Sequence, residues 1–184
     1  MTRILILSGS LRAASYNTLL AHAAAALLPH GASAEVATLH GIPLYDGDVE
    51  DREGMPPAVL ALKEKVLATD GLLLATPEYN SGMPGVLKNG LDWLSRADRK
   101  AVFHGRPVGL MGATPGGFGT LSAQAAWLPV LKALGMQVYS GGALYLSRAH
   151  TALDAQGRWT DAQARQMLAD FLAGFAAFVA RQRG

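Results

Sequence analysis

The sequence predicts an α/β domain in which a five-stranded parallel sheet lies between two layers of helices. Segments typical of buried strands alternate with helical segments five times along the chain, the pattern that builds a parallel sheet covered on both faces. Three of these strands are followed by loops rich in glycine, serine or proline, at the edge where such sheets bind ligands. The 184 residues, half of them hydrophobic, suffice for a full core, and we expect one domain over residues 1–184.

The first half of the chain begins with two strands, each followed by a helix. The apolar run Ile4–Leu7 predicts a short buried strand, and hydrophobic residues recur at the spacing of one helical face within Leu19–Leu28. Ala34–Leu39 predicts the second strand. The segment Gly41–Pro57 is rich in proline, glycine and aspartate, which is typical of a long surface loop. Hydrophobic spacing in Val59–Leu67 predicts the helix that follows.

The middle of the chain continues the alternation. Gly71–Thr76 is a continuous apolar run, which is typical of a strand buried on both faces. Val86–Leu94 has the hydrophobic spacing of a helix, and Arg106–Ala113 predicts the fourth strand.

The C-terminal part predicts a further helix, a fifth strand and a final helix. The first of these helices extends to about Leu134, and Pro129 should kink it or delay its start because proline lacks a main-chain donor. Met136–Ser140 predicts the fifth strand. The last helix is the clearest, since Ala164–Val179 carries one continuous apolar stripe.

Composition excludes several classes of protein. The chain has no cysteine, so we expect no disulfide, thiolate metal site or cysteine nucleophile, and redox chemistry would need an organic cofactor. The formal net charge is +2 and no cluster of lysine and arginine marks a nucleic-acid surface. No apolar run is long enough to span a membrane. We therefore expect a cytoplasmic protein without nucleic-acid or membrane partners.

The loop after the first strand has the features of a phosphate site. Main-chain N–H groups and the positive end of a helix dipole would face an anion there. Ser10, Ser15 and Asn17 add short hydrogen-bonding side chains, and Arg12 adds a charged donor. The chain contains neither a Walker lysine nor a GxGxxG motif, so a P-loop and a standard dinucleotide site fit poorly. The simpler alternative is that Ser15 or Asn17 only caps the helix.

The second and third loops could form the surface on which a planar ligand binds. Pro77, Glu78, Tyr79 and Asn80 open a segment whose prolines and glycines fix the backbone, and the tyrosine could cover an aromatic face. Alternatively, the tyrosine is a half-buried surface residue and the glutamate a capping or salt-bridge residue. The third loop would allow close backbone approach to a ligand, or have no special role; its candidate residues are Thr114, Gly116, Gly117 and Phe118.

Taken together, these segments resemble the NADPH-dependent FMN reductase family, which includes bacterial quinone, chromate and azo-dye reductases. The likeness runs in family order from the first strand to the last, and its most specific part is the Pro-Glu-Tyr-Asn block. The residues that carry it are Gly9, Ser10, Leu11, Arg12, Ser15 and Asn17, Ile42–Asp46 with Asp48, Pro77–Asn80, and Pro84, Leu87, Lys88, Asn89, Asp92 and Trp93. Of these, Asn89, Asp92 and Trp93 are expected to be structural.

The resemblance implies a flavodoxin-like three-layer sandwich that binds FMN and uses NADPH or NADH as co-substrate. It implies that Ser10, Arg12, Ser15 and Asn17 hold the FMN phosphate, that Pro77–Asn80 lie against the isoalloxazine, and that Gly116, Gly117 and Phe118 lie near its pyrimidine side. Implied acceptors are quinones, with chromate, azo compounds and free flavin as further candidates. A homodimer or homotetramer is implied as well.

The functional hypothesis is a ping-pong cycle in which NAD(P)H reduces the flavin, leaves, and is replaced by a quinone. No general acid or base is required, so we name no catalytic residue. One alternative is an electron carrier without reductase activity, although a flavodoxin-type carrier should be acidic. Another is a hydrolase of a phosphorylated ligand, for which the scattered histidines offer no nucleophile–base pair.

Many relatives carry arginines where Ser122, Ala126, Trp127 and Leu128 stand, so the preference between NADPH and NADH stays open.

Overall fold

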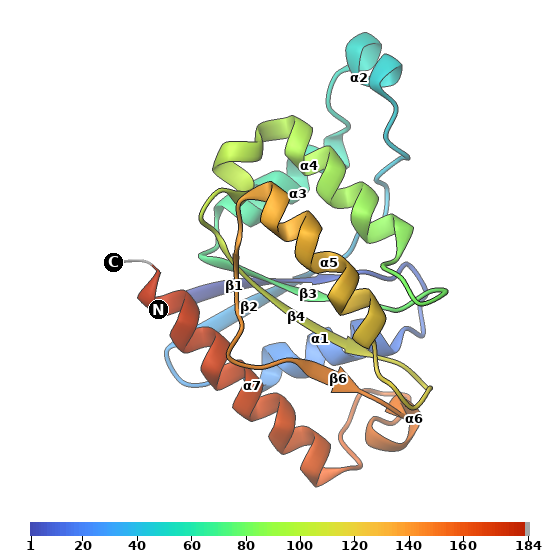
Figure 1. Cartoon of the computed structure of the whole chain (residues 1–184), viewed down its shortest axis with the longest axis vertical. Helices are drawn as coiled ribbons and strands as arrows, with labels where there is room; N and C mark the ends of the chain where they lie inside the picture. Colours follow the sequence, from blue (N-terminus) through green and yellow to red (C-terminus); the bar gives the residue numbers. More distant parts are fainter. Residues whose placement is uncertain (183–184) are drawn as a thin grey trace.

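The computed structural model describes residues 1–182 and contains a parallel sheet with the order β2-β1-β3-β4, whose outer edge beyond β4 carries both β5 and β6 (Figure 1). The strands are β1 (Thr2–Ser8), β2 (Ala32–Ala37), β3 (Gly71–Ala75), β4 (Pro107–Ala113), β5 (Gln137–Val138) and β6 (Leu144–Leu146). Every pairing between them is parallel. This 2-1-3-4-5 order is that of flavodoxin-like sheets, so the predicted fold class is confirmed.

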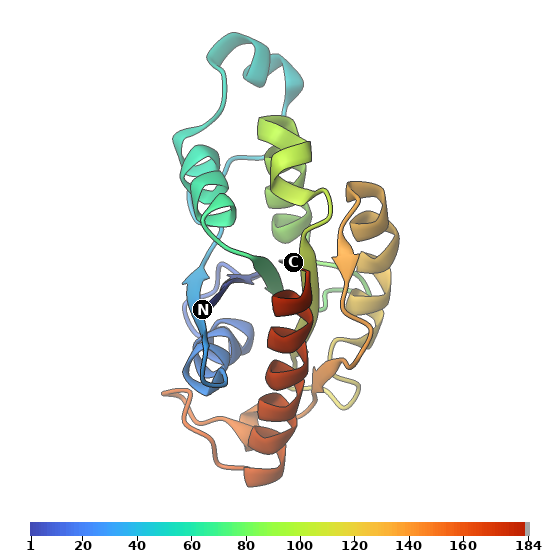
Figure 2. The ribbon, with the colours of Figure 1, turned by 90° about the vertical axis from the view of Figure 1, so that its left-hand side faces the viewer.

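Helices cover both faces of the sheet. They are α1 (Tyr16–Leu27), α2 (Gly47–Glu53), α3 (Pro57–Leu67), α4 (Gly85–Phe103), α5 (Leu121–Leu134), α6 (Ala149–Ala152) and α7 (Ala162–Arg181). One face packs against α1 and α7, and the other against α3, α4 and α5 (Figures 1 and 2). Within residues 1–182, none of the helices combines the length and the apolar character needed to cross a bilayer.

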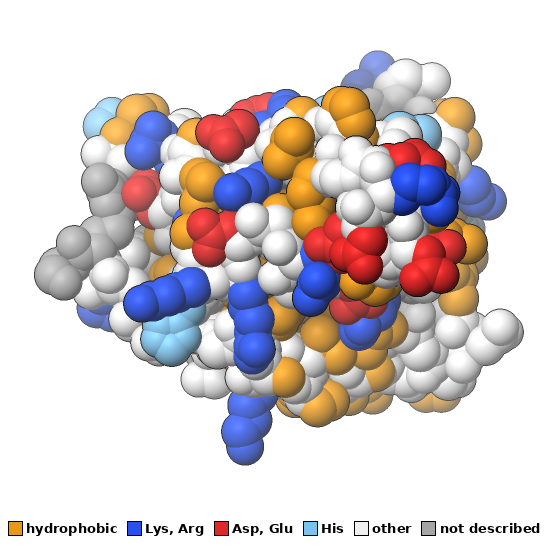
Figure 3. All heavy atoms as spheres, turned by 90° about the horizontal axis from the view of Figure 1, so that it is seen from above, with side chains coloured by type: hydrophobic (Ala, Val, Ile, Leu, Met, Phe, Trp, Pro, Cys, Tyr) orange, Lys and Arg blue, Asp and Glu red, His pale blue; other side chains and the backbone are white. Residues whose placement is uncertain are grey.

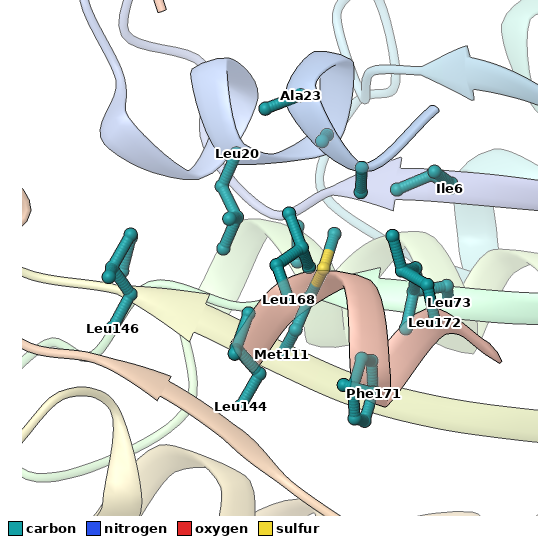
Figure 4. Close-up of a cluster of buried hydrophobic side chains, with 14 of the residues drawn as sticks. Ile6, Leu20, Ala23, Leu73, Met111, Leu144, Leu146, Leu168, Phe171 and Leu172 are labelled. Carbon is teal, nitrogen blue, oxygen red and sulfur yellow. The ribbon is translucent and has the colours of Figure 1, made fainter. Parts of the chain in front are cut away.

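Two hydrophobic cores result from the alternation of side chains along the strands. In β1, Ile4 and Ile6 belong to the core on one face, while Leu5 and Leu7 belong to the core on the other. Figure 4 shows the first of these cores, in which Leu168 and other side chains of α7 lie over the sheet. Because β1 is buried on both faces, its sequence is a continuous apolar run and carries no polar alternation.

The segment predicted as a long surface loop contains α2, which projects from the body of the molecule (Figure 1). Asp46 caps this helix by accepting a hydrogen bond from the Asp48 N–H at 2.9 Å. Gly54, with a φ of 77°, follows its last residue. No residue of α2 is buried, so the helix has no apolar stripe from which the sequence could reveal it.

The fifth strand is shorter than predicted and the chain returns to the sheet as β6. Tyr139 follows β5, and its ring contacts Phe171, Phe175 and Phe178 of α7 at centroid distances of 5.9, 5.7 and 5.5 Å. A Cβ atom on Gly141 would lie 2.6 Å from the Tyr139 ring. The main-chain N–H of Tyr139 still donates to the Val108 carbonyl of β4 at 2.8 Å, so the chain diverges from the sheet only after this residue.

The prediction that Pro129 delays the start of its helix is wrong, because α5 begins at Leu121 and continues through Pro129. A proline at this position leaves the carbonyl four residues earlier, that of Ala125, without its helical donor. Both residues are exposed, so water can satisfy the carbonyl. The helix therefore tolerates the proline on its solvent side.

Candidate functional site

Three loops meet at the carboxyl edge of the sheet and enclose a cavity of about 340 Å³. They follow β1, β3 and β4, as the sequence predicts. The cavity is lined by Ser10, Arg12, Ser15, Tyr16, Asn17, Pro77, Glu78, Tyr79, Ala113, Thr114 and Pro115. The predicted convergence of the loops is thus confirmed. Tyr16, Ala113 and Pro115 were not predicted, although each is adjacent in sequence to a predicted residue.

Two glycines allow the loops to approach one another. A Cβ atom on Gly9 would lie 2.9 Å from the Pro77 side chain, which belongs to the second loop. A Cβ atom on Gly112 would overlap the Thr120 hydroxyl and the Thr76 carbonyl oxygen. These contacts leave no room for a side chain, so the close approach of the first, second and third loops depends on glycine at both positions.

The first loop leaves hydrogen-bond donors free at the start of α1. Ser15 caps the helix, because its hydroxyl accepts hydrogen bonds from the N–H groups of Asn17 (3.2 Å) and Thr18 (3.4 Å). The N–H groups of Ala14 and Tyr16 have no acceptor within residues 1–182. The first turn holds no acidic side chain that could neutralise the helix dipole. The capping interpretation of Ser15 is confirmed, and the remaining donors suit an anion.

Arg12 lines the cavity and is hydrogen-bonded within the first loop. Its Nη2 donates to the carbonyl of Ala14 at 2.8 Å, and its main-chain N–H donates to the Ser10 hydroxyl at 3.3 Å. The guanidinium is exposed and keeps its remaining N–H groups for a ligand. Arg12 therefore adds a positive charge beside the free donors of the helix.

Asn17 lines the cavity but its side chain is engaged with the protein. The Nδ2 donates to the Ala113 carbonyl and the Oδ1 accepts from the Ala113 N–H, both at 2.9 Å. Asn17 is 4% exposed. Its amide therefore connects the first loop to the end of β4.

The second loop is a tight turn that presents Tyr79 at the rim of the cavity. Tyr79 and Gly82 exchange main-chain hydrogen bonds of 3.1 and 3.0 Å. Between them, Asn80 and Ser81 have φ values of 52° and 58°, which is the geometry of a type I′ turn. Tyr79 is 50% exposed, so its ring is available to a ligand. Asn80 lies in the turn and does not line the cavity.

Glu78 joins the second loop to the start of α5. Its Oε2 accepts a hydrogen bond from the Ala123 N–H at 3.0 Å. The N-cap residue of α5, Thr120, makes no capping bond with its side chain, so Glu78 supplies the cap from another part of the chain. The capping alternative for Glu78 is confirmed, and the residue also lines the cavity.

The third loop contributes its first residues to the cavity. Thr114 lines it, whereas Gly116, Gly117 and Phe118 do not, and Phe118 is 87% exposed. The segment before α6 anchors this loop, since Ala149 N–H donates to the carbonyl of Thr114 (3.0 Å) and the next hydrogen bond joins Arg148 to Gly116 (2.9 Å).

The helix after the second loop supports the segment that leads to α2. Asn89 accepts a hydrogen bond from the Tyr45 N–H and donates one to the Pro43 carbonyl, both at 2.8 Å. Trp93 donates to the same carbonyl at 2.9 Å, and its ring meets that of Tyr45 edge-on at 4.9 Å. The expectation that Asn89 and Trp93 are structural is confirmed.

An ion pair between Arg96 and Glu50 connects α4 to α2. Figure 3 shows this end of the molecule, where positively and negatively charged side chains are interspersed. A hydrogen bond from Arg96 to Glu50, 2.9 Å long, lowers the pKa of the Glu50 carboxyl, and the Tyr45 hydroxyl adds a further bond at 3.0 Å. The same contact with Glu50 raises the pKa of Tyr45. These groups do not line the cavity.

Several reductases are similar to this chain over nearly its whole length. A family model described as NADPH-dependent FMN reductase matches residues 2–151. An NAD(P)H-dependent FMN reductase from Pseudomonas aeruginosa is 43% identical over 182 residues, covering 99% of this chain and 97% of that protein. A 2-hydroxy-1,4-benzoquinone reductase from Burkholderia sp is 36% identical over 181 residues, 98% of each. The solved structure of a flavoenzyme NAD(P)H:(acceptor) oxidoreductase from Paracoccus denitrificans has a TM-score of 0.88 at 28% identity, covering 99% of both chains.

Proposed function

The chain belongs to the NADPH-dependent FMN reductase family, and we propose that it binds FMN in the cavity between its three loops and passes hydride from NAD(P)H to quinones. One observation carries the assignment of the cofactor to this cavity. Free N–H groups at the start of α1 and a positive side chain lie at one end of a cavity whose other walls come from the second and third loops.

The cavity fits a phosphorylated planar cofactor. Its volume of about 340 Å³ lies within the range of cofactor sites, roughly 300–1,000 Å³. The N–H groups of Ala14 and Tyr16, together with Ser10 and Arg12, would hold the phosphate. Pro77–Tyr79 and Thr114 would contact the ring system. Asn17 would act indirectly, by fixing the first loop to β4.

When bound, FMN would accept and release hydride, which no side chain that lines the cavity can do. The residues of the chain therefore bind and orient. Turn geometry holds Tyr79 at the rim, where its ring can cover one side of a planar ligand. None of the described residues that line the cavity is a histidine, and a transfer that needs no general base is consistent with this set.

The names of the relatives support quinones as the class of acceptor. A relative with 36% identity is a 2-hydroxy-1,4-benzoquinone reductase and one with 32% identity is a quinone reductase. We propose quinones as acceptors, with NADPH or NADH as donor. Both substrates would use the same exposed side of the cavity beside Tyr79 in turn, which is the basis for ping-pong kinetics.

A homodimer or homotetramer stays a prediction. Its support is the exposed apolar surface of α5, where Leu121 and Leu128 are 50% and 49% exposed. Light scattering of the purified protein tests it, and a monomer at all concentrations would contradict it.

The experiment that tests the function has two steps. The absorbance spectrum of the purified protein, before and after addition of FMN, should show bound flavin. Anaerobic mixing of the FMN-loaded protein with NADPH, and separately with NADH, should bleach the flavin with at least one nucleotide, and a benzoquinone should then restore the colour. Protein-free FMN at the same concentration is the control. A protein that ignores FMN, or bound flavin that neither nucleotide bleaches, would overturn the proposal.

A further inference from the structure

His40 connects the segment after β2 to the loop after β1. Its Nε2 lies 3.1 Å from the carbonyl oxygen of Leu11, and its Nδ1 lies 3.0 Å from the hydroxyl of Thr38. A carbonyl oxygen can only accept, so Nε2 must carry the hydrogen. In the neutral ring, Nδ1 then accepts from the Thr38 hydroxyl. The ring is therefore held at both nitrogens.

This contact is the one hydrogen bond, among residues 1–182, that joins loop residues 10–14 to another part of the chain. The other bonds of these residues lie within the loop, from Arg12 to Ser10 and to Ala14. Leu11 is 44% exposed, so its side chain is only partly packed. His40 is therefore the group that fixes the direction of the Leu11 carbonyl.

The bond also sets the direction of a main-chain donor. In a trans peptide the C=O and the following N–H point in opposite directions, and the described residues contain no cis peptide. Since the Leu11 carbonyl points at His40, the Arg12 N–H points the opposite way, where it meets the Ser10 hydroxyl. Ser10 and Arg12 line the cavity, whereas Leu11 and His40 do not.

We propose that His40 is a positioning residue for the phosphate of the cofactor. By holding the Leu11 carbonyl on the outside of the loop, it keeps the Arg12 N–H on the Ser10 oxygen, which leaves the Ser10 hydroxyl hydrogen for the phosphate. Without His40, the peptide between Leu11 and Arg12 can rotate and break the hydrogen bond from the Arg12 N–H that orients the Ser10 hydroxyl. The inference rests on the proposed function, because it concerns the phosphate end of the same cavity.

The test compares FMN with riboflavin, which carries the same ring without the phosphate. For His40→Ala, we expect FMN to bind about three- to tenfold more weakly, the range of one hydrogen bond, while riboflavin affinity stays within about twofold of its original value. His40→Gln should recover part of the loss because its amide can donate to the same carbonyl. His22→Ala is the matched control. His22 lines the same surface hollow beside β2 as His40, but within residues 1–182 it makes no hydrogen bond to the loop. Thermal unfolding of each variant shows that it folds.

The outcomes are distinguishable. An equal loss for both ligands, or no loss for either, would overturn the role of His40 while leaving the proposed function intact. A loss of FMN affinity in His22→Ala equal to that in His40→Ala would overturn it as well. A wild-type protein that binds neither ligand would remove the proposed function and this inference together.

Discussion

The side-chain amide of Asn17 and the main chain of Ala113 exchange two hydrogen bonds of 2.9 Å across 96 residues of sequence. They join the first turn of α1 to the last residue of β4, and so bring two walls of the cavity together. Both residues are buried. Water therefore cannot replace these hydrogen bonds, and losing them costs free energy.

Replacing this amide should destabilise the fold. In Asn17→Ala the N–H and C=O of Ala113 lose their partners, and we expect the free energy of unfolding to fall by about 2–4 kcal/mol. Urea denaturation measures it. Gln163→Ala is the control, because this exposed residue should change stability by less than about 0.5 kcal/mol. Equal stability of the two variants would contradict the structural role of Asn17.

Gly112 and Gly116 provide a matched pair of glycines near the cavity. Gly112→Ala should destabilise the protein by about 3 kcal/mol or prevent folding, because the added Cβ overlaps Thr120 and the main chain of Thr76. Gly116→Ala should be close to neutral, since the nearest atom would lie at 3.7 Å. Both are measured by thermal unfolding, and the prediction fails if Gly112→Ala unfolds at the wild-type temperature.

Arg12→Ala should weaken cofactor binding without affecting the fold. The exposed guanidinium would form charge-assisted hydrogen bonds with the phosphate, which are worth about 1.5–3 kcal/mol, so FMN affinity should drop roughly tenfold or more. Fluorescence titration with FMN measures this. Riboflavin affinity should not change, and Arg52→Ala, on α2 and outside the cavity, should leave both affinities unchanged. A similar loss for riboflavin would argue against a phosphate contact.

Ser81→Gly should stabilise the turn of the second loop. Ser81 has a φ of 58°, a conformation that costs a residue with a side chain about 1–2 kcal/mol. Glycine relieves this cost but loses more entropy on folding, about 0.5–1 kcal/mol, so the net gain should be about 0.5–1 kcal/mol. The same change at Ser122, inside α5, should instead lower stability. A destabilised Ser81→Gly protein would contradict the assigned turn.

The contact between Glu50 and Arg96 should depend on pH. Because the folded protein lowers the pKa of Glu50, its ionised carboxylate stabilises the fold at pH values above the unfolded pKa, and this stabilisation is lost as the pH falls through the folded pKa. The difference in melting temperature between wild type and Glu50→Gln should therefore be largest at neutral pH and shrink in acid. Glu64→Gln is the control, since Glu64 forms no ion pair within the described residues. A difference that does not vary with pH would refute the prediction.

The alternation of the main strands and helices, and the place of the cavity, could be predicted from the sequence, whereas α2, β6 and α6 were not. Unbroken apolar runs such as Ile4–Leu7 and Gly71–Thr76 indicate strands that are buried on both faces. The apolar stripe of Ala164–Val179 indicates the face of α7 that packs on the sheet. Since parallel strands have their carboxyl ends at one edge, the three loops had to meet there.

Tertiary structure alone decided which polar groups meet. Spacing in the sequence reveals which face of an element is buried, but a hydrogen bond between distant residues leaves no periodic pattern. The sequence predicts Asn17 as a phosphate ligand but does not reveal that its amide bonds to Ala113, nor that Glu78 caps α5 from a separate loop. Two further features were not visible in the sequence. No residue of α2 is buried, so this helix has no apolar stripe. The fifth strand ends early beside Tyr139, whose ring packs against Phe175, a residue far away in the chain.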